Sequence, residues 1–298
     1  MSGTEALVGF ALVVGFAAPG LLRRAHWPQR APGVAVLVWL GLMLSFVTSL
    51  ALAAHHLVEP EKHRHAGLPS LLHACGLTHL TDLGLSTAAL APALVAAWPL
   101  GRVAAVLVRA GRERRRHAAV LDLVARPAAG LPALLLDHQV PAVYCLPGRR
   151  RRIVLTRGAL EQLPPAQLHA VLAHEQAHLT GRHHLLKAAA QGFAEAFPGL
   201  PLGTAGREQT ATLLEMAADD RAVRHHARRD LAAALGTVAA GLAPGAGLGA
   251  AGSPVVARVR RLLSPARAPH PLARCATGAL ALAVPLLPFL LTCGPAAN

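Results

Sequence analysis

Long apolar stretches without charge alternate with basic segments along this chain. Four stretches lack Asp, Glu, Lys and Arg over most of a bilayer span, at residues 6–22, 31–54, 83–101 and 275–298. Because about 20 apolar residues in a helix cross the hydrocarbon core, the pattern predicts transmembrane helices at about 5–22, 34–54 and 83–104, and a fourth within 272–298. A fifth uncharged stretch, 231–257, is rich in Ala and Gly and contains two prolines, so we interpret it as a helix followed by a linker.

The basic residues flank these stretches unevenly. Arginines follow the first and third predicted spans, whereas the loop 55–82 has nearly balanced charge. Since cytosolic loops carry an excess of Lys and Arg, we expect the N- and C-termini and this loop to be external. The chain then divides into a membrane region at 1–108, a cytosolic catalytic domain at 109–271, and a fourth span with a short external tail at 272–298. This organisation predicts a multi-pass protein of the cell membrane.

Composition supports a membrane protein and limits the partners. The chain is 53% apolar and only 15% charged, and its formal net charge is +14. Most of its arginines flank predicted spans, where anionic inner-leaflet lipid explains them, so the lipid bilayer is an expected partner and nucleic acid is not. The four cysteines show no Cys-x-x-Cys spacing, which argues against a thiolate metal site.

The central region predicts helices around a small β-structure. Apolar and β-branched runs at 131–136, 140–146 and 153–155 favour a hairpin or small sheet. Pro164 and Pro165 favour a helix start, and helical apolar spacing continues until Gly181, which is expected to cap the helix. Further helices are expected at 185–197 and 206–228. The predicted fold is therefore mainly α and integral to the membrane, with a small sheet in the cytosolic domain.

The central helix contains the sequence His174-Glu175-Gln176-Ala177-His178. Two histidines four residues apart share one helix face, so both imidazoles can bind one Zn²⁺, with Glu175 beside the open coordination position as general base. The motif predicts a zinc hydrolase with one metal ion per chain. His174 and His178 are the expected metal ligands, and Glu175 is the expected catalytic residue.

A catalytic zinc site needs a third protein ligand, and the sequence offers two candidates. Glu215 would complete a His₂Glu site, with Asp219 one turn later orienting a ligating imidazole. Alternatively, His184 completes the metzincin pattern His-Glu-x-x-His-x-x-Gly-x-x-His. We favour Glu215 because the one later methionine, Met216, lies within a predicted helix rather than in a Met-turn. His183 and His184 are then expected to be solvated or interfacial residues beyond a helix end.

Four segments together carry a family resemblance. They are 142–148, 154–160, 169–178 and the sequence Glu215-x-x-Ala218-Asp219-Asp220. They resemble the integral-membrane metallopeptidases typified by the beta-lactam antibiotic sensor-transducers (BlaR/MecR type), which are related to the prenyl-protein and heat-shock membrane proteases. The resemblance covers about 3–293 and implies a cytosolic, gluzincin-like protease domain. It implies zinc ligation by His174, His178 and Glu215, with Glu175 as base and Asp219 as the acid behind a ligand.

One departure from that family limits what the resemblance implies. The antibiotic sensors carry a large external penicillin-binding domain after the last span, whereas only a few residues follow Cys293 here. Antibiotic sensing is therefore not expected.

The predicted function is a membrane-embedded zinc-dependent endopeptidase that cleaves a cytosolic or membrane protein, with a role in regulatory signalling. The resemblance implies a cytosolic transcriptional repressor as substrate, and quality control of membrane proteins is the alternative. A catalytically silent membrane signalling protein is a further alternative, although the intact Glu175 argues against it.

Overall fold

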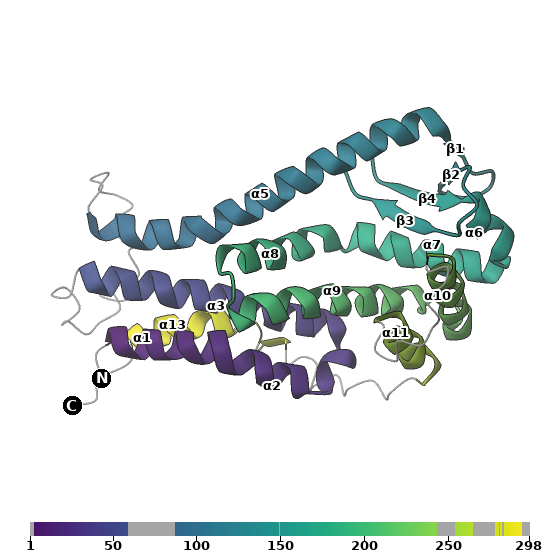
Figure 1. Cartoon of the computed structure of the whole chain (residues 1–298). Coiled ribbons are helices and arrows are strands. Elements are labelled where there is room, and N and C mark those ends of the chain that lie inside the picture. The colour runs from purple at the N-terminus through teal and green to yellow at the C-terminus, as the bar shows by residue number, and fades with distance from the viewer. Residues whose placement is uncertain are drawn as a thin grey trace.

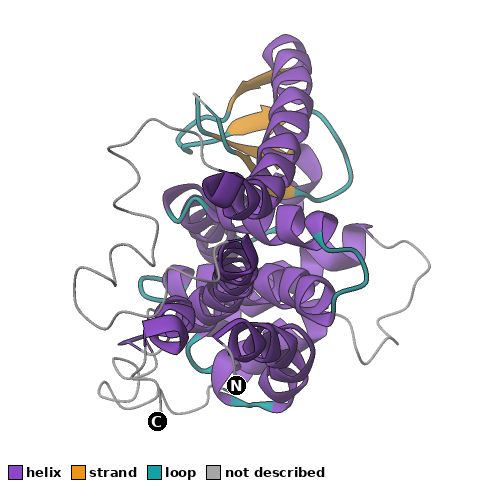
Figure 2. Ribbon diagram, turned by 90° about the vertical axis from the view of Figure 1, so that its left-hand side faces the viewer, coloured by secondary structure: helices purple, strands orange, loops and turns teal. Residues whose placement is uncertain are grey.

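The computed structural model describes residues 3–58, 87–148, 150–242, 254–264, 278–279, 281 and 283–293. Helices dominate, and one small sheet lies at one end of the molecule (Figures 1 and 2). Most of the predicted external loop 55–82, about half of the predicted region 272–298 and the expected linker after residue 242 lie outside the described residues.

Three described helical segments are long and apolar enough to cross a membrane: Gly3–Arg24, Pro32–Val58 and Leu90–Val124. The first combines α1 (Gly3–Leu12), the π-helical η1 (Val13–Ala17) and α2 (Ala18–Arg24), and the short 3-10 helix η2 (Trp27–Gln29) leads into α3 (Pro32–Val58). Near the C-terminus, η5 (Val284–Leu286) and α13 (Leu287–Cys293) lie against α3, where Ser45 Oγ donates a hydrogen bond to the carbonyl oxygen of Val284 at 3.0 Å. Three of the four predicted spans thus have matching helices, and their orientation stays a prediction.

The third long helix, α5 (Thr87–Val124), continues well beyond the end expected at about 104. Its additional residues are mostly Ala, Leu and Arg, which are strong helix formers, so the basic segment simply extends the helix. On the neighbouring helix, Glu195 accepts hydrogen bonds from Arg102 at 3.0 Å and Arg109 at 2.7 Å. The helix therefore crosses the predicted boundary at 108/109 without a break, and the domain division there stays a prediction.

A four-stranded sheet follows α5, with β1 (Ala125–Pro127), β2 (Leu134–Leu136), β3 (Val143–Leu146) and β4 (Arg152–Thr156) in the order β1-β2-β4-β3. β3 and β4 form the expected antiparallel hairpin, in which Val143 is paired with Leu155, whereas β2 pairs parallel to β4. β1 was not predicted because Ala-Arg-Pro has little strand propensity, and its pairing with β2 supplies the structure instead. β3 is left at one edge of the sheet, beside α7.

Six helices complete the described fold: α6 (Arg157–Gln162), α7 (Pro165–Thr180), α8 (His183–Ala196), α9 (Pro201–Ala222), α10 (Arg228–Leu242) and α11 (Pro254–Leu263). α7 has the bounds that the proline start and Gly181 predict. α9 begins and ends about five residues earlier than expected, because Pro201 occupies its first turn and the chain leaves the helix at Val223.

One hydrophobic core joins the candidate membrane helices to the helices that follow the sheet. Trp39 and Met43 of α3 pack in the same buried cluster as Leu202, Leu213 and Leu214 of α9. Consequently, α9 is fixed directly against a candidate membrane span.

Close helix contact explains one glycine in α8. A Cβ atom on Gly192 would lie 2.6 Å from Cα of Val103 in α5, whereas one on Gly236 in α10 would meet nothing within 4 Å. We expect Gly192→Ala to destabilise the protein by about 1–3 kcal/mol through overpacking. Gly236→Ala should stabilise it by up to about 1 kcal/mol through helix propensity. Thermal unfolding in detergent tests this pair, and equal shifts for both variants would contradict the close packing of α5 and α8.

Candidate metal centre

Helix α7 brings the two motif histidines together. The Nε2 atoms of His174 and His178 lie 3.1 Å apart, and the His174 side chain is only 3% exposed. The buried residues Leu168, Val171 and Leu172 anchor α7 in a core shared with the sheet. Both rings therefore sit on a rigid helix rather than on a loop.

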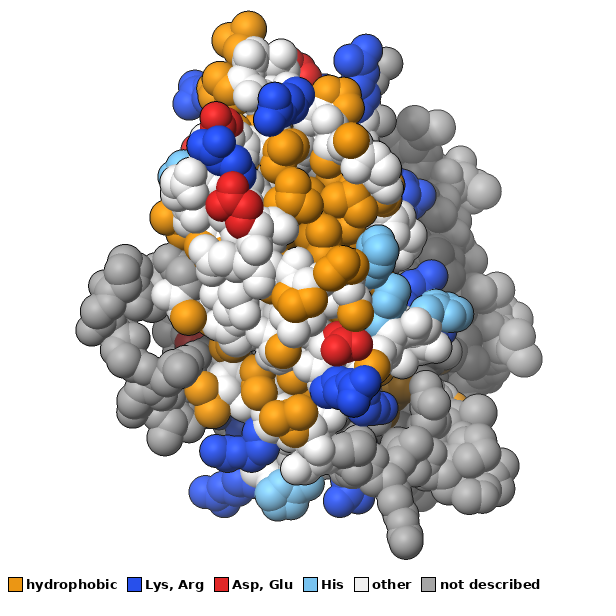
Figure 3. All heavy atoms as spheres, turned by 90° about the vertical axis from the view of Figure 1, so that its right-hand side faces the viewer, with side chains coloured by type: hydrophobic (Ala, Val, Ile, Leu, Met, Phe, Trp, Pro, Cys, Tyr) orange, Lys and Arg blue, Asp and Glu red, His pale blue; other side chains and the backbone are white. Residues whose placement is uncertain are grey.

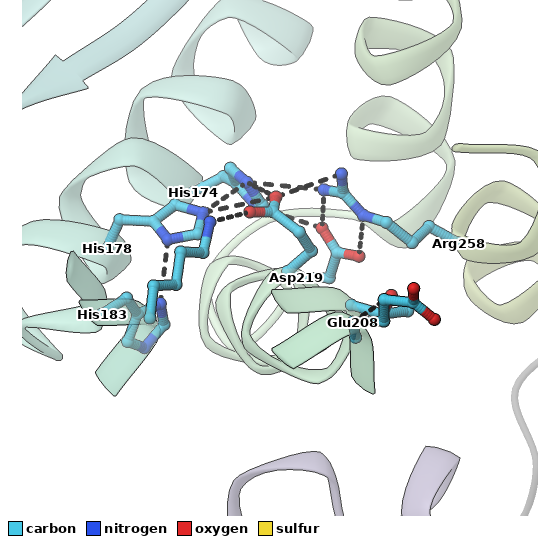
Figure 4. A network of polar contacts seen from close by, with 9 residues as sticks. His174, His178, His183, Glu208, Asp219 and Arg258 are labelled. Carbon is cyan, nitrogen blue, oxygen red and sulfur yellow. Dashed lines mark hydrogen bonds and ion pairs between the residues drawn. The ribbon is translucent and has the colours of Figure 1, made fainter. Parts of the chain in front are cut away.

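Helix α9 places Glu215 opposite these rings. Its Oε2 lies 3.5 Å from Nε2 of His174 and 3.5 Å from Nε2 of His178, while Lys187 of α8 binds the other carboxylate oxygen at 2.9 Å. Tetrahedral zinc with bonds of about 2.0–2.1 Å requires ligand atoms roughly 3.3 Å apart. The three donor atoms thus fit a zinc site in both chemistry and spacing. Figure 4 shows His174 and His178 on the same helix, within this polar network.

A buried ion pair supports the cluster from behind. Asp219 is fully buried, and its Oδ1 lies 3.0 Å from Nδ1 of His174, the contact expected for a group that orients this ring. Arg258 of α11 donates to both Asp219 oxygens, from Nε at 2.9 Å and from Nη2 at 2.7 Å. Its Nη1 also lies 3.2 Å from Oε2 of Glu215. Figure 4 shows Arg258 reaching this network from a separate helix.

Arg258 was not identified from the sequence as part of the site. Its position in α11 contained a signal, because Val255 lies three residues before it and Leu262 four residues after it on the same helix face. These residues belong to or pack against a buried cluster. An arginine on the same buried helix face is expected to pair with an acidic residue inside the protein. Lys187 was also missed, because a partly exposed lysine on a surface helix does not by itself indicate an internal partner.

The network shifts the titration of its members. Burial lowers the pKa of His174, but hydrogen bonds to Asp219 and Glu215 outweigh it and raise the pKa to about 9. Burial raises the pKa of Glu215, yet hydrogen bonds from His174 and His178 bring it far below its usual range. For Asp219, burial is likewise outweighed by the hydrogen bonds from Arg258 and His174, so its pKa is lowered. Both carboxylates are therefore ionised at neutral pH.

The two histidines after the motif occupy different places. Nδ1 of His183 lies 2.9 Å from Nδ1 of His178, and burial together with the neighbouring His178 lowers the pKa of His183 to about 4. His183 is therefore partly buried beyond the end of α7, which agrees with the expectation of an interfacial rather than a solvated residue. A Cβ on Gly181 would collide with the His183 ring, which explains a glycine there. Arg182 takes the left-handed conformation that leads into α8, with φ 49°.

His184, the alternative third ligand, lies elsewhere. Its pKa is lowered by burial and by three neighbouring arginines: Arg114, Arg151 and Arg182. Among the described residues, the group of candidate donor atoms comprises His174, His178 and Glu215 and does not include His184. The geometry thus favours His₂Glu ligation, and the assignment of ligands stays a prediction.

Glu175 points towards the edge strand β3. The Cys145 thiol lies beside its carboxylate, and burial and the Glu175 charge raise the pKa of Cys145 to about 12. Glu175 also contributes to the raised pKa of Arg258, which places its charge near the metal-binding cluster. Glu175 therefore lies close to both the sheet edge and the metal-binding cluster.

Comparison with known proteins agrees with this geometry. Residues 110–211 match peptidase family M48. That segment is about a third of the chain and includes the His-Glu-x-x-His motif, but it ends before Glu215. The chain is also similar to the Protease HtpX homolog of Acaryochloris marina (strain MBIC 11017), with 33% identity over 139 residues, or 44% of this chain and 43% of that protein. No solved structure matches the chain significantly. These matches support a membrane-type M48 protease and do not single out the beta-lactam sensor-transducers.

The pKa of His174 predicts how zinc affinity depends on pH. In the metal-free protein this imidazole is protonated below about pH 9, and a zinc ligand must be deprotonated. Binding then releases a proton, so apparent affinity should rise about tenfold per pH unit between roughly pH 6 and 8.5 and level off above about 9. Competition with a chelator of known affinity measures this slope. Asp219→Asn should flatten it by lowering the pKa of His174, and an equally steep slope in that variant would contradict the account.

Proposed function

We propose that this protein is a membrane-bound zinc-dependent endopeptidase. The observation that carries the proposal is the convergence of the His174, His178 and Glu215 donor atoms beside Glu175 on the same helix as the two histidines. The M48 match and the similarity to a protease support the same class of reaction. Three apolar helices of membrane-spanning length support attachment to a bilayer.

The proposed mechanism divides the work among these residues. His174, His178 and Glu215 would hold zinc, which when bound polarises a scissile carbonyl and makes water more acidic. Glu175 accepts a proton from the attacking water and then donates it to the leaving amine. Asp219 and Arg258 keep the His174 ring oriented, and Lys187 directs Oε2 of Glu215 towards the histidines.

The free edge of β3 is the proposed binding site for an extended substrate. β3 is an edge strand, and no described strand pairs with its outer side. Its residue Cys145 lies beside Glu175, so a peptide added along this edge would pass the general base. Main-chain hydrogen bonds would then hold the substrate, and side-chain pockets would set its selectivity.

We further propose a multi-pass orientation in the cell membrane, with the catalytic region in the cytosol. The excess of arginine after the first and third spans supports this orientation. A cytosolic protein, such as a transcriptional repressor in a signalling pathway, is the proposed substrate. Quality control of membrane proteins is the other role that this placement allows.

The Glu175→Gln variant tests the catalytic proposal. It should retain zinc but lower peptide cleavage by at least about 100-fold, because it removes the group that transfers the proton. Gln176→Ala, at the exposed neighbouring position of α7, is the matched control and should cleave as the wild type does. Comparing new protein N-termini in cells that express each variant gives both the activity and the substrate. Undiminished cleavage by Glu175→Gln would contradict the proposed peptidase function of this protein.

A further inference from the structure

A strongly basic cavity lies apart from the metal-binding cluster. It has a volume of about 890 Å³ and is bounded by the α2–α3 connection, the end of α9, the start of α10 and α11. Six basic side chains line it: His26, Arg30, Arg224, Arg228, Arg260 and Arg261. Among the described residues that line it, Asp220 is the one acid. Figure 3, viewed from the side on which α10 and α11 lie, shows Lys and Arg side chains gathered towards its lower edge.

This positive charge is largely uncompensated. Asp220 is already bound by Nη2 of Arg261 at 2.7 Å, and Nε of Arg261 donates to the carbonyl oxygen of Gln29 at 2.8 Å. The remaining nitrogen, Nη1, is buried and has no hydrogen-bond partner among the described residues. Arg224, Arg228 and Arg260 likewise form no ion pair with a described residue. Arginine side chains bind oxygen-rich anions through charge-assisted hydrogen bonds, so a cavity lined by five arginines is suited to such an anion.

The position of the cavity favours one source for that anion. It lies where the candidate spans 3–24 and 32–58 meet, and Val34 and Leu37 at the start of α3 contribute an apolar wall. Leu37 is 47% exposed on a helix that suits the bilayer. We propose that the cavity binds a phosphate group, supplied by the headgroup of an anionic phospholipid whose acyl chains follow the start of α3.

Occupancy of this cavity would also stabilise the metal-binding cluster. Arg261 lines the cavity, while Arg258, one turn earlier in α11, holds Asp219 and contacts Glu215. A phosphate bound by Arg260 and Arg261 would therefore fix the helix that supports His174. This regulatory step rests on the proposed peptidase function, whereas the binding itself does not.

Two double variants test whether lipid binding depends on the cavity itself or only on the positive charge of the surface. Arg224→Gln with Arg228→Gln removes two lining charges, and Arg221→Gln with Arg229→Gln removes two exposed charges nearby that do not line the cavity. Binding of fluorescent phosphatidylglycerol to the purified full chain in detergent should weaken about tenfold or more in the first pair. The control pair should stay within about twofold of the wild type, because charge outside the cavity makes no direct contact. Unchanged unfolding midpoints establish that both pairs are folded.

The competitors identify the source of the phosphate. Phosphatidylcholine should compete poorly, and millimolar inorganic phosphate should not displace the lipid. Displacement by inorganic phosphate as effective as by phosphatidylglycerol would support the phosphate site but overturn the lipid source. Equal losses in the two variant pairs, or equal binding of phosphatidylcholine, would overturn the site itself.

Activity tests the step through α11 separately. Wild-type protein in phosphatidylglycerol nanodiscs should cleave peptide several-fold faster than in phosphatidylcholine nanodiscs. Lipid binding with equal cleavage in both would overturn the coupling through α11. Lipid binding without cleavage in either would contradict the proposed function and leave the binding site standing.

Discussion

The Oε2 atom of Glu215 is held 3.5 Å from two imidazole nitrogens that belong to a different helix. The packing of both helices against the rest of the fold fixes this contact. α7 is anchored by the sheet, whereas α9 is anchored by α3. Gly206 lets α9 approach Trp39 and Met43 so closely that a Cβ there would collide with the Met43 side chain. A candidate membrane span therefore sets the position of a candidate metal ligand.

Charge compensation explains why so many ionisable groups are tolerated around that contact. A buried carboxylate is strongly destabilising unless it is paired and hydrogen-bonded, and Asp219 has both a two-point contact with Arg258 and a contact with His174. Lys187 neutralises the other side of Glu215. Such a network fixes side-chain geometry in a way that an apolar core does not, which is what a metal-binding site requires.

The parts of the structure that depend on local sequence could be predicted, and the parts that depend on distant contacts could not. The i, i+4 spacing was sufficient to predict that His174 and His178 share one helix face, and that Glu215 and Asp219 share another. Proline and glycine marked the ends of α7. β1 forms because β2 offers hydrogen bonds, so its own sequence gave little indication. Arg258 meets Asp219 across 39 positions of sequence, and His183 contacts His178 across the break between α7 and α8, where Arg182 takes the left-handed conformation. Neither contact follows from helical periodicity.

The identity of the third ligand is the central claim, and metal analysis of two single variants tests it most directly. The purified Glu215→Ala protein should lose most of its bound zinc, because two histidines alone bind the ion weakly. The His184→Ala protein should retain about one zinc per chain, since His184 lies among arginines rather than with the other donors. Zinc retained by Glu215→Ala and lost from His184→Ala would contradict the account and favour the three-histidine arrangement.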